Sequence, residues 1–289
     1  MTWVRDGIVL APGGEDEPDS LRQWRPWVLE ENEGTLRMWY SGHDGTTWRI
    51  LEAVQVGGAW KRLGVVIDAG FGGDTDDFGV QAPCVVRTPG GYLMAYAGFD
   101  GEVTRLHMAS SPDGDVWEPL GTFLQRGEED EAGASHPSLL QTGEGWWLFY
   151  SGYDGSDNGR RARVLAAVSG NGASWDRIGP VLEPLAEEVA AGHPCVIEHE
   201  RRFHLFFASE DGEGVAIVRA TSADGLAWER RGPALLPGAE GPDGLATHSP
   251  CVVRLRDGSL RMWYSALPAG DTAFEYRICA ARHEGPLLH

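Results

Sequence analysis

The sequence predicts an all-β fold, a five-bladed β-propeller with four antiparallel strands in each blade. Three observations lead to this prediction. A proline followed by an apolar run recurs five times, with a spacing of about 56 residues, at Pro26, Pro83, Pro137, Pro194 and Pro250. Two further strand-like segments and a segment that starts at a tryptophan follow each of the first four prolines. The fifth copy of the tryptophan segment is absent after Pro250 and is found near the N-terminus.

Each predicted blade begins with a short strand at its proline. The five segments are RPWVLEE, APCVVRT, HPSLLQT, HPCVIEH and SPCVVRL. The second strands are TLRMWYSG, GYLMAYAG, GWWLFYSG, RFHLFFAS and SLRMWYSA, and the third are TWRILEAV, TRLHMASS, RARVLAAVS, GVAIVRATS and EYRICAAR. These runs are rich in valine, isoleucine and aromatic residues and are bounded by glycine, aspartate or proline, which is typical of strands.

The fourth strands start at Trp60, Trp117, Trp175 and Trp228. Since the missing fifth copy is found at Trp3, we predict that the N-terminal segment forms the outer strand of the last blade. Such a closure removes the two exposed edges of an open array of blades. Residues 1–289 are therefore predicted to form one domain.

The turns before three of the fourth strands read SSPDGDVW, SGNGASW and TSADGLAW. They resemble the Asp-box turns that are common in propeller glycosidases. Asp or Asn side chains can accept hydrogen bonds from the backbone two residues later. We therefore predict a structural role for these turns.

The composition limits the partners and the compartment. The net charge of −19 makes nucleic acid and anionic membranes poor partners. No segment approaches the roughly 20 apolar residues that cross a bilayer, and the first residues lack the pattern of a signal peptide, so a cytoplasmic protein is predicted. The four cysteines lie in apolar runs, three of them directly after a blade proline, which predicts reduced, buried packing residues. The sequence does not indicate an oligomeric state.

Three rows of charged residues follow the repeat. Acids stand about seven residues before the prolines, at Asp19, Asp76, Asp130, Glu187 and Asp243. The ends of the second strands carry Asp44, Asp100, Asp154 and Asp211, and the third strands start with Arg49, Arg105, Arg163 and Arg277. A feature repeated in this way favours a scaffold role, with the last two rows pairing with each other. One copy of the first row could still be recruited for catalysis.

The two positions before each proline do not repeat, and we expect them to surround the mouth of the central channel. They read Trp24-Arg25, Gln81-Ala82, Ser135-His136, Gly192-His193 and His248-Ser249. Irregular residues on a regular scaffold indicate a ligand pocket. Three histidines with Gln81 also form a candidate site for a divalent metal ion, with His136, His193 and His248 as its other ligands.

The whole chain resembles the five-bladed propeller superfamily of arabinanases, β-xylosidases, invertases and levansucrases. Strand pairs such as APCVVRTPGGYLMAYAGFDG and HPSLLQTGEGWWLFYSGYDG, followed by the Asp-box-like turns, carry this resemblance. The resemblance implies three catalytic carboxylates, at positions where this chain has Arg25, Ala82 and Ser135. Glycoside hydrolysis by paired carboxylates needs one protonated and one ionised group, so the usual chemistry of the superfamily is not expected here.

Three functions remain, in order of preference. The first is a divergent glycosidase-like enzyme that acts on a sugar or sugar-like small molecule. Its relocated acids are sought among Asp76, Asp77, Asp100, Asp154 and Glu210, with His136 or His193 as the proton carrier. The predicted substrate-binding residues are Trp24, Arg25, Gln81, Ser135, His136, His193, His248 and Glu210.

The other two functions change the role of the channel. A non-catalytic sugar-binding propeller would have lost the carboxylates together with the reaction. A metal-dependent enzyme, such as a lyase, would use Gln81, His136, His193 and His248 as ligands. That ligand set is similar to the manganese site of the oligogalacturonate lyases, which have seven blades.

Overall fold

The structure is a computed structural model that describes residues 2–32, 34–70, 75–156 and 161–285. Within these residues, the chain forms strands β1 to β20, and a short 3₁₀ turn lies at Glu128–Asp130. The predicted all-β class is therefore confirmed. No helix in the described part of the chain is long and apolar enough to cross a membrane.

Twelve strands form three four-stranded antiparallel sheets, each in chain order. The first sheet contains β2 (Arg22–Glu30), β3 (Leu36–His43), β4 (Trp48–Val56) and β5 (Ala59–Ile67). The second contains β6 (Gly79–Thr88), β7 (Gly91–Phe99), β8 (Thr104–Ser111) and β9 (Glu118–Leu124). The third contains β10 (Gly133–Thr142), β11 (Gly145–Tyr153), β12 (Ala162–Ser169) and β13 (Asp176–Leu182).

The remaining eight strands form two antiparallel four-stranded units that meet at one parallel pair, Val215 with Ala246. One unit contains β14 (Ala190–His199), β15 (Arg202–Glu210), β16 (Val215–Ser222) and β17 (Glu229–Leu235). The other contains β18 (Ala246–Arg254), β19 (Leu260–Leu267), β20 (Arg277–Glu284) and β1 (Thr2–Leu10).

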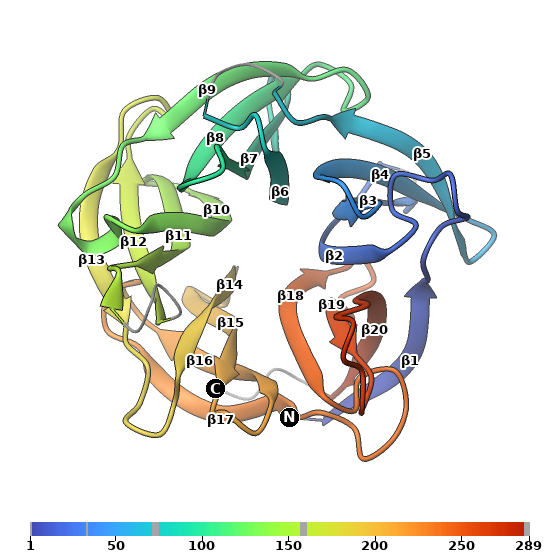
Figure 1. The fold of residues 1–289 in the computed structure, drawn as a ribbon. Coiled ribbons are helices and arrows are strands. Elements are labelled where there is room, and N and C mark those ends of the chain that lie inside the picture. The colour runs from blue at the N-terminus through green and yellow to red at the C-terminus, as the bar shows by residue number, and fades with distance from the viewer. Residues whose placement is uncertain (1, 33, 71–74, 157–160, 286–289) are drawn as a thin grey trace.

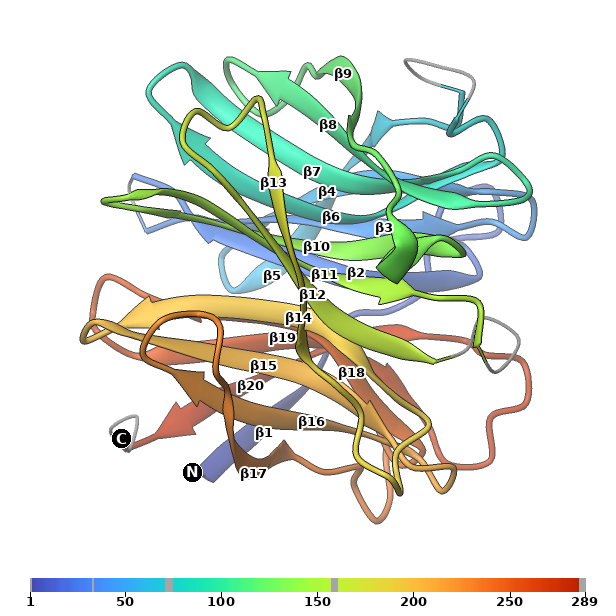
Figure 2. The ribbon, with the colours of Figure 1, turned by 90° about the vertical axis from the view of Figure 1, so that its left-hand side faces the viewer.

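These units stand around a central axis, with β2, β6, β10, β14 and β18 nearest to it (Figure 1). This is the arrangement of a β-propeller. The strand β1 pairs antiparallel with β20, with Trp3 opposite His283, and both views show the two strands side by side (Figures 1 and 2). The predicted pairing of the N-terminal strand with the last unit is thus confirmed.

The turns before the fourth strands are tied to their own backbone. The side chains of Asp113, Asn171 and Asp224 each accept N–H groups two and three residues later. The indole N–H of Trp117 donates to the carbonyl of Gly114 at 2.7 Å, and Trp175 and Trp228 repeat this bond. The structural role predicted for these turns is confirmed.

Every innermost strand carries an irregularity at its proline, where the register with the second strand shifts. The residue before the proline has a positive φ in all five copies: Arg25, Ala82, His136, His193 and Ser249, at 50° to 55°. This left-handed conformation is uncommon outside glycine and is stabilised by the surrounding structure. Three of these residues donate their backbone N–H to a serine of the preceding unit, at Ser265, Ser41 and Ser151.

All four cysteines are free and buried, as predicted. Three thiols also have a role that the sequence did not predict. The Sγ atoms of Cys84, Cys195 and Cys251 accept the backbone N–H of Leu139, Val252 and Val28, at 3.1 to 3.2 Å. Each bond joins the innermost strand of one unit to that of the next, so the thiols connect neighbouring units near the axis.

Candidate functional site

Most of the acids about seven residues before the prolines form buried ion pairs that hold the loops of the scaffold. In four units a buried acid pairs with an arginine of the outer strand: Asp19 with Arg62, Asp130 with Arg177, Glu188 with Arg230 and Asp243 with Arg5, at 2.6 to 2.9 Å. The fourth member is Glu188, which is buried, whereas Glu187, which we predicted, is exposed. These pairs fix the loop before each innermost strand, so the structural interpretation of this row holds in four units.

Asp76 is the exception in this row. Its side chain is buried, Oδ2 accepts the hydroxyl of Tyr96 at 3.2 Å, and Oδ1 has no hydrogen-bond partner among the described residues. The nearest cationic candidate is His107, whose Nδ1 lies 3.7 Å from Oδ2. Burial raises the pKa of Asp76 to about 6 and lowers that of His107 to about 4. Both side chains pack against Gly98 of β7, where an added Cβ would collide with Asp76 and with His107 of β8.

The other predicted acids lie in loops of their own. Asp100 and Asp154 accept N–H groups of their own turns and pair with Arg105 and Arg163. These hydrogen bonds and the arginines lower the pKa of both carboxyls, which keeps them ionised. Asp77 is exposed. None of the three lines the axial pocket described below, so the structure does not bring these catalytic candidates to the histidines.

The three predicted histidines do converge at the axis. The rings of His136 and His193 are stacked, with centroids 3.6 Å apart and an angle of 11° between their planes. The ring of His248 lies 5.6 Å from that of His193, and Trp24 packs edge-on against all three. Ser135 also belongs to this cluster, since its Oγ lies 2.5 Å from Nδ1 of His136.

A hydrogen-bond chain orders the rings. The indole N–H of Trp24 donates to Nδ1 of His248 at 3.1 Å, so that nitrogen carries no proton and the neutral ring is protonated at Nε2. The hydroxyl of Ser249 lies 3.0 Å from the same nitrogen and 2.8 Å from Nδ1 of His193. These distances fit a chain in which Nδ1–H of His193 donates to Ser249 and Ser249 donates to Nδ1 of His248, which also accepts the indole N–H of Trp24. Nε2 of His248 is buried and has no hydrogen-bond partner among the described residues.

Burial lowers the pKa of all three histidines. The pKa of His248 falls to about 3, and those of His136 and His193 fall well below the ordinary value. The nearby guanidinium of Arg25 contributes to each shift, because a positive charge disfavours imidazolium. The rings are therefore neutral at pH 7, and each has one N–H donor and one unprotonated nitrogen.

A small pocket of about 130 Å³ opens beside these rings, and we call it the axial pocket. It is lined by Trp24, Ala162, Ala190, Gly192, His193, Ala208, Glu210, Val215, His248 and Tyr276. The structure thus brings four predicted binding residues together in one cavity: Trp24, His193, His248 and Glu210. Of the predicted residues outside it, His136 and Ser135 belong to the adjoining cluster, Arg25 is completely buried, and Gln81 is half-buried in β6.

The pocket opens where the repeat has its smallest side chains. Gly192 occupies the place of Trp24, Gln81, Ser135 and His248, and it faces Ala208 in the neighbouring strand. A Cβ at Gly192 would approach the Oγ of Ser151 to 2.9 Å, so this glycine cannot be enlarged without movement.

Tyr276 was missed by the sequence interpretation. Its ring stacks on Trp24 with centroids 5.9 Å apart and lies 4.9 Å from the ring of His248. A signal was present, because Tyr276 directly precedes an arginine of the repeated row, as do Trp48 and Thr104. The equivalent residues in the third and fourth units, Ala162 and Val215, also line the pocket.

The proposed metal ligands do not form a chelating set. No group of three or more His, Cys, Asp or Glu side chains among the described residues is placed to hold a metal ion. The lone pairs of an imidazole lie in its ring plane, so two parallel stacked rings cannot both point at one ion between them. The structure therefore gives no support to the metal-dependent reading of these histidines.

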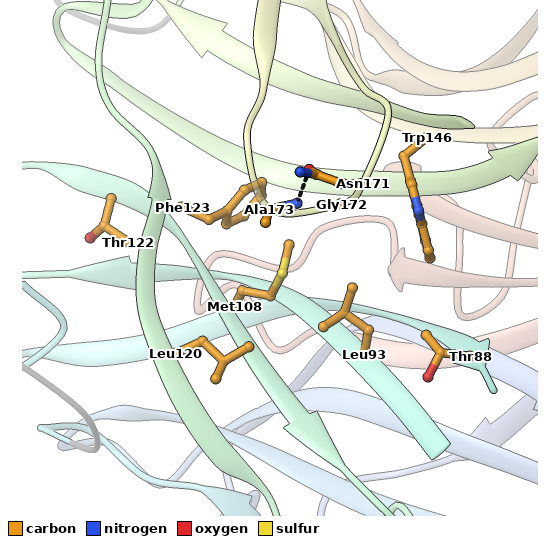
Figure 3. Close-up of a pocket in the computed structure, with 10 residues that line it drawn as sticks. All are labelled: Thr88, Leu93, Met108, Leu120, Thr122, Phe123, Trp146, Asn171, Gly172 and Ala173. Carbon is orange, nitrogen blue, oxygen red and sulfur yellow. Dashed lines mark hydrogen bonds between the residues drawn. The ribbon is translucent and has the colours of Figure 1, made fainter. Parts of the chain in front are cut away.

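A larger pocket of about 540 Å³ lies between the second and third sheets (Figure 3). Leu93, Met108 and Leu120 line one side, and Trp146 and the turn that begins at Asn171 line the other (Figure 3). This pocket contains none of the predicted site residues and no side chain that is titratable near neutral pH. The axial pocket is therefore the better candidate for chemistry.

No protein-family model matches the chain. Two proteins of Mycobacterium tuberculosis are similar to it, the uncharacterized proteins MT1551 of strain CDC 1551 / Oshkosh and Rv1502 of strain ATCC 25618 / H37Rv. Each is 28% identical over 297 residues, which cover 95% of this chain and 98% of the relative. The likeness therefore extends over nearly the whole of both proteins.

Several solved structures of glycoside hydrolases share the fold. A glycoside hydrolase is 17% identical with a TM-score of 0.81, over 98% of this chain and 92% of its own. A thermostable family-43 glycoside hydrolase is 17% identical with a TM-score of 0.73, over 97% and 93%. A member of the GH130 family, which contains mannoside phosphorylases and hydrolases of β-1,2 mannosidic linkages in Candida mannan, is 16% identical with a TM-score of 0.74, over 96% and 93%. At these identities the likeness shows a common propeller-type fold.

Proposed function

We propose that this protein is a glycosidase-like five-bladed propeller that acts on a sugar or sugar-like small molecule in the axial pocket. The observation that carries the proposal is the pocket itself. It combines one carboxyl group, Glu210, with the neutral imidazoles of His193 and His248 and the aromatic rings of Trp24 and Tyr276. Aromatic rings and convergent polar groups are the usual lining of a small-molecule site.

The size of the pocket limits the ligand. A cavity of about 130 Å³ is below the roughly 300–1,000 Å³ of drug-sized sites, so one small ring or the end of a longer chain fits. Carboxylate and imidazole acceptors suit the hydroxyl groups of a sugar. The glycoside hydrolases with the same fold support this class of ligand.

The chemistry would differ from hydrolysis by a pair of carboxylates. Among the described lining residues, Glu210 is the only acid, and Arg25, Ala82 and Ser135 occupy the positions of the expected carboxylates. We assign Glu210 the role of the single carboxyl group and His193 that of the proton acceptor. The neutral imidazole of His193 has one unprotonated nitrogen that can receive a proton, although its lowered pKa makes it a weaker base than an exposed histidine.

A non-catalytic sugar-binding propeller is the second candidate, because the pocket lacks a second carboxylate for the usual reaction. We also propose that residues 1–289 form one domain and that the five four-stranded units are five blades. The four buried free cysteines support a reducing, cytoplasmic environment.

The test is a panel of monosaccharides and aryl glycosides, with binding measured by calorimetry and turnover by release of the aryl group. We expect Glu210→Gln to retain binding and to reduce turnover about 100-fold or more. Glu213→Gln, at an exposed acid outside the pocket, is the matched control and should behave as the wild type. Binding by the wild type without turnover of any glycoside would support the second candidate. Absence of binding across the panel would refute both.

A further inference from the structure

The larger pocket of about 540 Å³, which we call the side pocket, lies between β7 of the second unit and the turn that begins at Asn171 in the third (Figure 3). Leu93 of β7 forms part of one wall, and the ring of Trp146 and the turn glycine Gly172 form part of the other. The repeat brings the same elements together at two other junctions between units. Those two junctions show which groups fill this space when it is occupied.

An arginine fills the space between the first and second units. Arg37, the counterpart of Leu93 in the repeat, lies over the ring of Tyr92 with its guanidinium carbon 5.8 Å from the ring centroid. It covers the turn glycine Gly114 so closely that an added Cβ would lie 2.6 Å from Nη1. The next residue of the turn, Asp115, forms an ion pair with the same guanidinium. A flat cation matched by an acid therefore occupies this junction.

An indole fills the space between the third and fourth units. Trp147, the counterpart of Leu93 there, lies beside the ring of Phe203 with the centroids 5.7 Å apart. A Cβ added at the turn glycine Gly225 would meet the six-membered ring of Trp147 at 3.0 to 3.4 Å. The next residue of the turn, Leu226, is uncharged. This junction therefore pairs a neutral flat ring with a turn that has no acid at this position.

Neither group is present between the second and third units. Leu93 has an aliphatic side chain, and the ring of Trp146, the counterpart of Tyr92, has no ring or cation partner among the described residues. Ala173 stands in the turn where Asp115 meets the arginine of the first junction. The open space thus has the surroundings of a flat ring and lacks the acid that would hold a cation.

We propose that the side pocket binds a neutral, flat aromatic molecule of about the size of indole, with its ring against Trp146. None of the described lining residues carries a charge near neutral pH, so burial of an ionised ligand would be unfavourable. Aromatic rings and a thioether attract an aromatic ligand beyond the area that they bury, and Phe123 and Met108 supply both in the lining.

The remaining features of the cavity fit the same ligand. Its volume lies within the roughly 300–1,000 Å³ of small-molecule sites, so the ring may carry substituents without a clash. The hydroxyl of Thr88 lines the pocket and can accept an N–H or O–H group of the ligand. The proposal does not depend on the proposed function, because the side pocket shares no lining residue with the axial pocket.

The solution test measures the binding of indole to the full-length protein by calorimetry. Leu93→Trp supplies the ring that Trp147 supplies at its own junction, so it should fill the side pocket and weaken indole binding by about 10-fold or more. Leu63→Trp, at an exposed leucine of β5 outside the pocket, is the matched control and should bind indole as the wild type does. No saturable binding to the wild type, or equal affinity in the wild type and Leu93→Trp, would overturn the proposal.

The structural test is a crystal of the wild type soaked with 5-bromoindole and measured for the anomalous scattering of bromine. It decides the question even if Leu93→Trp fails to fold. A bromine peak between Leu93 and Trp146 would confirm the proposal. A peak confined to the axial pocket, beside Trp24 and Tyr276, or the absence of any peak would overturn it.

Discussion

The second unit of the ring lacks one arginine, and restoring it should stabilise the protein in a pH-dependent way. In four units, an arginine of the outer strand faces an alanine of the third strand and reaches the buried acid. These pairs are Arg62 with Ala53, Arg177 with Ala167, Arg230 with Ala220 and Arg5 with Ala281. The matching pair in the second unit is Pro119 with Ala109. Pro119→Arg therefore places a guanidinium where Asp76 can receive it.

The magnitude follows from the raised pKa of Asp76. In the folded state Asp76 keeps its proton up to about pH 6, whereas an ordinary aspartate has a pKa of 3.8. The folded protein therefore loses stability as the pH rises from about 3.8 to about 6. His107, with a pKa of about 4 in place of 6.5, acts in the opposite direction and masks this cost in the wild type. An arginine that keeps Asp76 ionised removes the cost. Each pH unit between pH 4.5 and the raised pKa is worth about 1.4 kcal/mol of unfolding free energy. The gain in stability of Pro119→Arg over the wild type should therefore be larger at pH 7.5 than at pH 4.5 by about 2 kcal/mol at most.

The assay is urea denaturation of the wild type and Pro119→Arg at both pH values. Loss of the proline and ordering of the arginine lower stability by an amount that does not depend on pH, so the difference between the two pH values isolates the charge effect. In a protein that already carries Asp76→Asn, Pro119→Arg should change the free energy of unfolding by the same amount at pH 4.5 and at pH 7.5. The reasoning would be refuted if, with Asp76 present, Pro119→Arg changed the free energy of unfolding equally at pH 4.5 and at pH 7.5.

Three further predictions concern the scaffold and the pocket. Ser41→Ala removes the acceptor of a buried backbone N–H in β6 and should cost about 1–3 kcal/mol in urea denaturation, whereas Ser174→Ala at an exposed turn should be neutral. Asn171→Ala removes the acceptor of two turn N–H groups and should lower the melting temperature, with an expected cost of about 1 kcal/mol. Gly192→Ala forces its Cβ against Ser151 and should cost about 1–3 kcal/mol while weakening any ligand of the axial pocket, as calorimetry would detect. An unchanged ligand affinity in Gly192→Ala would show that ligands bind elsewhere.

The strands were predictable because the same strand-like segments, with a tryptophan at the start of the fourth, recur in the same order along the chain. The pairing of β1 with β20 followed from one displaced copy, Trp3. The same reasoning was wrong at Glu187. Two adjacent acids, Glu187 and Glu188, fit the spacing of the row, and the structure shows that the second is the buried one. Periodicity identifies a row of residues, and it does not decide which of two neighbours faces the core.

The candidate site was predictable in part. The irregular positions before the prolines led to Trp24, His193 and His248, which do share a cavity. Their ring orientations were not predictable, since stacking and hydrogen bonding depend on backbone conformations with positive φ that the sequence does not specify. Tyr276 was overlooked because its row contains residues of every kind, and its position matters only through its contact with Trp24.

The residues that depart from the repeat occur in neighbouring pairs, in which one changed residue alters the charge environment of the other. In the second unit, the arginine is lost as Pro119, and a histidine appears at His107, where the other units have apolar residues or cysteine. At the axis, Arg25 replaces an expected acid, and its field helps to keep His136, His193 and His248 neutral. A cation in place of a carboxylate disfavours an imidazolium in the channel, so His193 is neutral at pH 7 and carries no extra proton to donate. In the proposed reaction, the proton for a leaving group would come from Glu210 or from solvent, and the pH dependence of any turnover in Glu210→Gln would distinguish the two sources.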